Sequence, residues 1–356
     1  MSRKLKNWFL RLIPAYRVRN AFHAENEAIQ QQLKTRVDQM NHKMEYLFWV
    51  TQRKQDETLA ETKQRVFLSL PKAEGELRLI QKMNLSILSA LREVCDASEI
   101  PFYLVFGTML GAIRHHGFIP WDDDVDVAML RDGYLKLEKA LQNHPTLCVD
   151  RYYSTMNEKF VKVKFHDSDT FFLDLFILDT FEADEETFLL RYQNLKTVHK
   201  EYSSAIREYL QGQNVDRSAY SIPKSNKLLD SKMRERYEQL CEAVNYYGKG
   251  DYFCFGIDNP AFIRNSGYVY HRDELFPAVS VTFEGQNYQT FACWDAWLRN
   301  AYGDYWSFPR NIMTGHGELS RLNEQDYQLL EMHGILDGDN QKNAGKGQIN
   351  SDSLEF

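Results

Sequence analysis

The sequence FYLVFGTMLGAIRHHGFIPWDDDVDVAM, residues 102–129, contains the features that decide the fold. Its first four residues, 102–105, are apolar and predict a short buried strand. After the step Gly107-Thr108, residues 109–113 predict the first turn of a helix. A Gly-Thr step between a strand and a helix directs backbone N–H groups outward, and such groups bind phosphate well. Gly107 and Thr108 are therefore candidate phosphate-binding residues.

Four aspartates close this stretch: Asp122, Asp123, Asp124 and Asp126. Val125 and Val127 alternate with acids, which predicts a strand in which Asp124 and Asp126 share one face. Carboxylates this close repel one another unless a cation neutralises them, and Mg²⁺ prefers oxygen ligands and phosphate partners. An acidic turn on a solvated surface is the alternative. The apolar neighbours and the adjacent Trp121 favour a metal site.

A second predicted strand carries two lysines on one face. Residues 160–165 alternate Phe160, Lys162 and Lys164 with apolar residues, the period of a strand. Solvent exposure is the simpler interpretation for either lysine alone. Because this strand lies between two acidic strands in the sequence, we expect Lys162 and Lys164 to contact phosphate.

A third predicted strand, residues 171–178, is apolar except for Asp174. A lone carboxylate in so apolar a run must be paired, protonated or bound to a metal. A structural ion pair is the alternative to a metal ligand at this position. Asp179 follows the predicted strand and is interpreted as a turn residue.

Residues 107–127 resemble the signature of the LicD family of phosphotransferases, which are relatives of fukutin and fukutin-related protein. The resemblance implies an α/β (α+β) nucleotidyltransferase-like fold, with a mixed sheet, added helices and here a helical N-terminal extension. It also implies an Asp-x-Asp pair and a third carboxylate on a later strand. On this basis Asp124, Asp126 and Asp174 are the expected catalytic residues and the ligands of Mg²⁺, or alternatively Mn²⁺.

The same resemblance implies a reaction. Family members transfer a phospho-alcohol, often phosphocholine, from a CDP-linked donor to a sugar hydroxyl of a surface glycan, and CMP is released. The expected acceptor is a glycan or glycolipid such as lipopolysaccharide, capsule or teichoic acid. Asp122 and Asp123 are given no role in the reaction, since either could cap the turn. The expected donor- and phosphate-binding residues are Gly107, Thr108, Arg114, His115, Lys162 and Lys164.

Two other functions fit parts of the pattern. A nucleotidyltransferase would use the same acids but attack an NTP and release pyrophosphate instead of CMP. A scaffold without activity would use the helical N-terminus at a membrane assembly, but the complete acid set and the Gly-Thr turn argue against it. The identity of the transferred alcohol is open among choline, glycerol, ribitol and ethanolamine.

Composition narrows the class of protein further. A chain of 356 residues suggests about two domains. The net charge of −7 gives no basic field that would attract nucleic acid. Five scattered cysteines without a Cys-x-x-Cys spacing argue against a zinc site or a disulfide framework, and fit a reducing compartment. No apolar run approaches the roughly 20 residues of a membrane span.

The N-terminal part predicts two helical segments. Residues 1–24 contain six Lys or Arg and no acid, with Trp8 and Phe9 among apolar residues at helical spacing. This pattern is typical of a basic amphipathic helix on an anionic membrane surface, here the inner face of the cell membrane, ending at Pro14. A helix packed on the enzyme's own body is the alternative. Residues 25–72 have a heptad-like seam and predict a stalk or a short coiled coil that could form a homodimer.

The catalytic domain is expected over residues 73–336, beginning with an amphipathic helix at 74–97. Residues 184–250 are polar and mostly helical, and 279–291 predict a β-hairpin. Residues 337–356, rich in Gly, Asn, Asp, Gln and Ser, predict a disordered tail. An aromatic cluster is formed by Tyr246, Tyr247, Tyr252, Phe253 and Phe255. We expect it in the core, and the alternative is a cage for a quaternary ammonium group.

Overall fold

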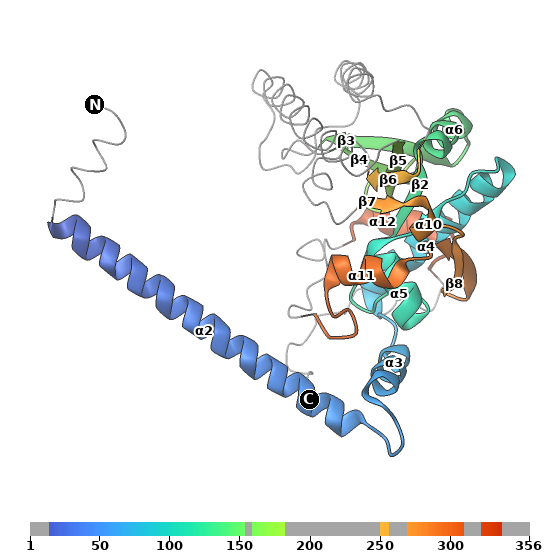
Figure 1. The fold of residues 1–356 in the computed structure, drawn as a ribbon. Helices are drawn as coiled ribbons and strands as arrows, with labels where there is room; N and C mark the ends of the chain where they lie inside the picture. Colours follow the sequence, from blue (N-terminus) through green and yellow to red (C-terminus); the bar gives the residue numbers. More distant parts are fainter. Residues whose placement is uncertain (1–13, 154–158, 182–249, 256–268, 310–321, 337–356) are drawn as a thin grey trace, which may run out of the picture. The chain divides into compact units, whose positions relative to one another are not determined.

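The computed structural model describes residues 14–153, 159–181, 250–255, 269–309 and 322–336 (Figure 1). The chain divides into two compact units, residues 1–66 and 67–356. In the described part, no helix is both long enough and apolar enough to cross a membrane. The predicted tail and all but the last residue of the predicted helical segment 184–250 lie outside the described residues.

The N-terminal unit is helical, as predicted. It contains α2 (Pro14–Gln52) and most of α3 (Leu59–Ser69). Pro14 was expected to end a helix but opens α2 instead, a position where its fixed φ and missing N–H cost little. Trp49 is almost fully buried, and the Lys63 ammonium lies 5.5 Å from the centre of its ring, which joins the two helices. The residues of the heptad-like seam are about half exposed: Ile29, Leu33, Val37, Met40, Met44 and Leu47.

The second unit is built on a mixed sheet with the order β1-β2-β5-β4-β3, and β6 pairs with β5 and β7. Strands β2 and β5 are parallel, and the other pairs are antiparallel. The predicted mixed α/β fold is thereby confirmed. The strands are β1 (Tyr103–Leu104), β2 (Asp126–Leu130), β3 (Leu147–Tyr153), β4 (Lys159–Phe165), β5 (Leu173–Phe181), β6 (Tyr252–Phe255) and β7 (Val269–His271).

Helices and a hairpin surround the sheet. The predicted hairpin is present as β8 (Val279–Phe283) and β9 (Gln286–Thr290). Helix α5 starts earlier than predicted, so Gly107 and Thr108 lie in its first turn and not in a break before it. The helices of this unit are α4 (Gly75–Ala97), α5 (Phe106–His115), α6 (Arg131–Leu141), α10 (Arg272–Leu275), α11 (Trp294–Tyr302) and α12 (Glu324–Met332).

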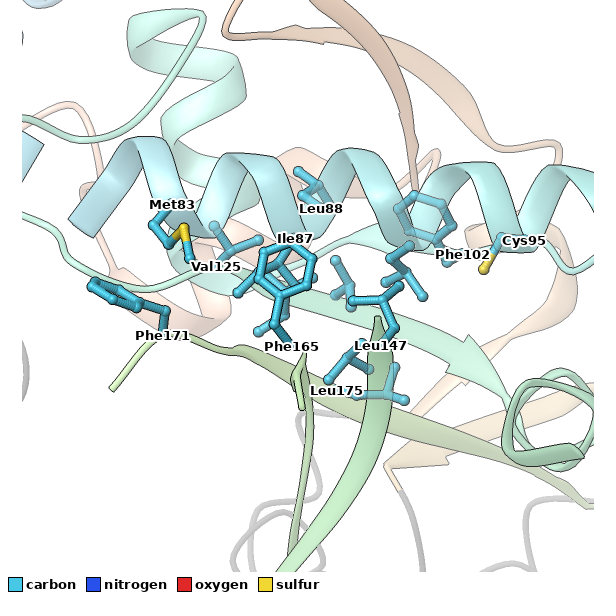
Figure 2. Packing of buried hydrophobic residues seen from close by; sticks show 14 of the residues in the cluster. Met83, Ile87, Leu88, Cys95, Phe102, Val125, Leu147, Phe165, Phe171 and Leu175 are labelled. Atoms are coloured by element: carbon cyan, nitrogen blue, oxygen red, sulfur yellow. The ribbon is translucent and has the colours of Figure 1, made fainter. Parts of the chain in front are cut away.

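Two hydrophobic cores lie on opposite faces of the sheet. On one face, α4 packs Met83 and Ile87 among side chains that include Leu175 (Figure 2). The other core contains Ala128 of β2 and Trp297 of α11. Successive strand residues point to opposite faces. The residues of β2 and β5 that do not belong to the core beneath α4 therefore face away from α4.

Two residues outside the acidic stretch have positions that the sequence did not settle. Asp179, predicted in a turn, lies inside β5 and is almost fully buried, where Arg131 donates to both of its carboxylate oxygens at 2.8 and 2.7 Å. The prediction for Asp179 was wrong because the strand continues three residues beyond the apolar run. Phe253 is fully buried, as expected of a core residue, while Tyr246 and Tyr247 lie outside the described residues.

Candidate functional site

Three aspartates meet at the start of the two parallel strands. Asp126 of β2 is paired in register with Asp174 of β5, and Asp124 precedes β2 by two residues. One carboxylate oxygen from each of the three lies within 4.8 Å of the others. Asp122, Asp123 and Asp124 satisfy the same condition, so Asp124 belongs to both groups. The structure therefore brings together the three acids that were expected from the sequence to be metal ligands.

Asp126 is the most enclosed of these acids, at 8% exposed. The Gly107 N–H donates to its carboxylate at 3.1 Å, and the Thr108 hydroxyl accepts from its backbone N–H at 2.7 Å. Burial raises the pKa of Asp126 well above its ordinary value, and the negative charges of Asp124, Asp174 and Asp122 raise it further. A cation at this position would reverse that effect by favouring the ionised carboxylate.

The turn at Gly107 allows the acids to approach the helix. A Cβ at Gly107 would lie 2.8 Å from an oxygen of Asp122 and 3.5 Å from an oxygen of Asp126. The preceding Phe106 has a φ of 44°, in the left-handed region that residues with side chains rarely adopt. Such strain costs about 1–3 kcal/mol and is concentrated at functional sites. Gly107 and Thr108 thus contact Asp126, whereas the sequence assigned them to a phosphate.

Lys162 is the basic residue that faces the acids. It is in register with Asp174 on the neighbouring strand, and its ammonium lies 3.7 Å from an Asp174 oxygen. Burial lowers the pKa of Lys162, and the charges of Asp174 and Asp124 partly offset that. Lys164 has other partners, Asp169 at 2.9 Å and Asp150 at 3.3 Å. The basic face predicted for this strand therefore divides between two sets of acids.

Residues 99–212 match the family of the LicD/FKTN/FKRP nucleotidyltransferase domain, a range that includes all of the acids above. This segment is similar to a LicD-type domain. Over 249 residues the chain is 27% identical to a protein from Haemophilus influenzae named "Lipopolysaccharide cholinephosphotransferase LicD". The alignment covers 65% of this chain and 92% of that protein. It is also 33% identical over 67 residues to an uncharacterized protein of Rickettsia prowazekii, covering 18% of this chain and 25% of that one.

Two further residues of the matching segment make their hydrogen bonds away from the acids. Arg114 is 3% exposed and donates to the carbonyl of Tyr305 at 2.6 Å, and its guanidinium lies 4.4 Å from the centre of the Phe67 ring. His115 accepts from Arg114 Nε at 3.0 Å, so its Nδ1 carries the proton and donates to the Phe67 carbonyl at 2.9 Å. Burial and, after it, the positive charge of Arg114 lower the pKa of His115 to about 3. His115 is therefore neutral at pH 7.

Three residues that contact this region were missed by the sequence-based reasoning. Gln81 and Asn84 of α4 donate to backbone carbonyls beside the aspartates, and Glu284 of the hairpin accepts from the Phe118 N–H at 3.3 Å. A signal for the first two was present, because they are polar residues at positions of α4 that belong to its apolar face. Glu284 follows a common hairpin pattern and gave no such signal.

Proposed function

We propose that this chain is a phosphotransferase that moves a phospho-alcohol, phosphocholine foremost, from a CDP-linked donor to a sugar hydroxyl of a surface glycan such as lipopolysaccharide. The observation that carries the proposal is the cluster of Asp124, Asp126 and Asp174 inside a LicD-type domain. Enzymatic phosphotransfer is supported by the similarity to the Haemophilus cholinephosphotransferase, of which the chain covers 92%. The CDP-linked donor, the Mg²⁺ and the release of CMP are part of the proposal.

The acids fit a hard divalent cation. All three supply carboxylate oxygens, the ligand type that Mg²⁺ and Mn²⁺ prefer, and a cation bound among them would relieve their mutual repulsion. Asp124, Asp126 and Asp174 would hold the ion. When bound, it offsets charge on the donor diphosphate and on the departing CMP.

The chain's own residues account for the remaining requirements of the reaction. The oxygen of the acceptor hydroxyl attacks the phosphorus that bears the alcohol, the bond from that phosphorus to the CMP oxygen breaks, and CMP departs with the bonding electrons. Asp174 orients the hydroxyl and accepts its proton, because it is less enclosed than Asp126. Lys162, whose ammonium is close to Asp174, binds a phosphate oxygen of the donor. Gly107 and Thr108 act through Asp126, whose position they hold.

A nucleotidyltransferase reaction is the second candidate, because the matching family is described as a nucleotidyltransferase domain. The deciding experiment incubates the full-length chain with Mg²⁺, lipopolysaccharide and each of CDP-choline, CDP-ethanolamine, CDP-glycerol and CDP-ribitol, and measures CMP. Parallel reactions with each NTP measure pyrophosphate. We expect CMP with one CDP-linked donor, and loss of that signal in Asp174→Asn. Pyrophosphate without CMP would support the second candidate. The absence of both products would support a scaffold without activity.

We further propose a peripheral location on the cytoplasmic face of the cell membrane and pairing with a second copy. Residues 1–24 carry six basic residues and no acid, which suits an anionic lipid surface. The exposed seam of α2 alternates steps of three and four residues between Leu33 and Leu47, the spacing that a partner helix of the same period would cover.

A further inference from the structure

The loop that carries the aspartates is held from behind by two amides of α4. Gln81 is fully buried and Asn84 is 3% exposed, and they are the two side chains with amide groups on a face that is otherwise apolar. A buried amide adds nothing to hydrophobic packing and costs free energy unless its polar atoms are hydrogen-bonded. Their N–H groups therefore call for acceptors, and the loop supplies them, whereas Asn84 Oδ1 has no hydrogen-bond partner among the described residues.

The contacts are made to three successive parts of the loop. Gln81 Nε2 donates to the carbonyl of Asp122 at 2.8 Å and to that of Ile119 at 3.3 Å. Asn84 Nδ2 donates to the carbonyl of Asp123 at 2.8 Å. Residues 122–125 belong to no helix or strand, so no ladder partner is supplied to the carbonyls of Asp122 and Asp123 by regular structure.

These hydrogen bonds fix the backbone on one side of Asp124. On the other side, the carbonyl of Val125 accepts from the backbone N–H of Asp174 at 2.9 Å. Asp124 is thus held between two anchored peptide groups, and it is the acid shared by both carboxylate groups. Fixing these peptide groups limits the directions in which the Asp124 carboxylate can point.

The amides and the carboxylates act from opposite faces of the sheet. Val125 and Val127 belong to the core beneath α4, so Asp126 between them points to the other face, on which Ala128 is buried. The amides can therefore hold the loop without occupying the space where a ligand would bind. Arg78 donates to Gln81 Oε1 at 3.0 Å, which orients the Gln81 amide with its N–H groups toward the loop.

We infer that Gln81 and Asn84 are positioning residues that hold the backbone of Asp122 and Asp123 against the mutual repulsion of the acids, and so place Asp124 where it can bind a divalent cation together with Asp126 and Asp174. The inference rests on the proposed metal-dependent function. Its physical basis is that like charges drive the loop apart when no cation is bound, and three hydrogen bonds from a rigid helix oppose that motion. Residues that orient metal ligands in this way typically contribute about 10- to 100-fold to metal affinity.

The test compares the full-length wild-type chain with Gln81→Met and Asn84→Leu, which keep the approximate size and remove the donors. Thr290→Val is the matched control, because it removes a buried hydrogen bond from a hydroxyl to the Leu104 carbonyl, 2.8 Å long, outside the loop. Mn²⁺ affinity is measured by calorimetry, thermal stability by calorimetric unfolding, and backbone exchange by mass spectrometry of peptides that span 119–126. We expect about tenfold weaker Mn²⁺ binding in the two α4 variants. Exchange in that segment of the metal-free chain should be faster.

The control should lose thermal stability but keep wild-type Mn²⁺ affinity. If the α4 variants bind Mn²⁺ as tightly as wild type, or if Thr290→Val weakens binding equally, the positioning role is wrong while the proposed function stands. If the wild-type chain itself binds no Mn²⁺, the metal-dependent function is wrong and this inference falls with it. A variant that does not fold is replaced by Gln81→Asn, which shortens the donor and should still weaken binding.

Discussion

At the scale of single residues, Asp126 combines burial with repulsion from three neighbouring acids. Asp126→Asn keeps an oxygen that can accept from the Gly107 N–H but removes one negative charge. We expect turnover to fall by at least about a hundredfold, since metal-ion stabilisation contributes several kcal/mol to such reactions. The metal-free variant should be at least as stable as wild type, because repulsion is relieved.

The measurement is turnover beside the thermal midpoint with and without Mg²⁺. Wild type should gain stability when Mg²⁺ is added, and the variant should gain little. Near-normal turnover at saturating Mg²⁺ would show that Asp126 is not a metal ligand.

Lys162 and Lys164 lie on the same face of β4 but pair with different acids, and so provide a matched comparison. Lys162→Met removes the cation beside Asp174, whereas Lys164→Met removes the partner of Asp150 and Asp169. We expect Lys162→Met to bind Mn²⁺ more tightly, because the metal no longer meets a like charge, and to have a higher KM for the donor. Changes of about tenfold correspond to about 1.4 kcal/mol. Lys164→Met should change neither the Mn²⁺ affinity nor the KM for the donor in this way. If the two variants have the same Mn²⁺ affinity and the same KM, the proposed role of Lys162 in binding the donor phosphate is wrong.

At the scale of elements, the β8–β9 hairpin is tied to the turn that precedes the aspartates. The Glu284 N–H donates to the His116 carbonyl at 3.0 Å, and its carboxylate accepts from Arg78 at 2.9 Å and Lys72 at 2.7 Å. Burial alone would raise the pKa of Glu284, but the hydrogen bonds from Arg78 and Lys72 outweigh it and lower the pKa below its ordinary value of 4.5. The hairpin thus depends on an ionised carboxylate.

The direction of the pH effect follows from that shift. A lowered folded-state pKa adds stability above the unfolded-state value of about 4.5, and this stability is lost as the pH falls through the folded-state pKa. Glu284→Gln should therefore destabilise the protein by about 2 kcal/mol at pH 7, and by less below pH 4. Urea denaturation at pH 7 and below pH 4 measures the loss of stability in Glu284→Gln relative to wild type. Glu93→Gln, at an exposed position of α4, is the control. A loss that is the same at both pH values would contradict the ionic role.

The seam of α2 leads to a prediction about association. A parallel pair of such helices would bury Leu33, Val37, Met40, Met44 and Leu47 against the same residues of a second copy. Met40→Lys should convert a dimer to a monomer in analytical ultracentrifugation, because it places like charges in the seam. Gln39→Lys adds the same charge at an exposed position off the seam and should leave the dimer intact. A wild-type chain that is monomeric at micromolar concentration would rule out this use of the seam.

At the scale of the whole molecule, the basic N-terminus and the acidic remainder carry opposite charge. The complete chain has a net charge of −7, although residues 1–24 contribute six basic side chains and no acid. Deleting residues 1–24 should abolish binding to vesicles containing phosphatidylglycerol while leaving turnover on a soluble acceptor unchanged. Salt should weaken binding of the intact chain because it screens the attraction. Neutral phosphatidylcholine vesicles serve as the control, and equal binding by both chains would contradict the prediction.

The elements of the fold were largely predictable from the sequence, because each depends on a local pattern. The apolar period of 74–97 corresponds to α4, the alternation at 160–165 to β4, and the turn residues between 279 and 291 to the hairpin. The three acids of the proposed metal site were predictable for a related reason. Asp124 and Asp126 stand in one short motif, and Asp174 is conspicuous as the acid within an apolar strand.

The partners of the site residues were decided by the tertiary structure. Gly107 and Thr108 contact Asp126, Arg114 reaches the carbonyl of Tyr305, and Gln81 reaches that of Asp122, although these residues are far apart along the chain. A periodic pattern specifies which face of an element is apolar, but it does not specify which element packs on that face or in which register. The sequence by itself determined the elements and the acids. Long-range packing decided which groups hold those acids in place, because hydrogen bonds require angstrom-scale positions that only the assembled fold supplies.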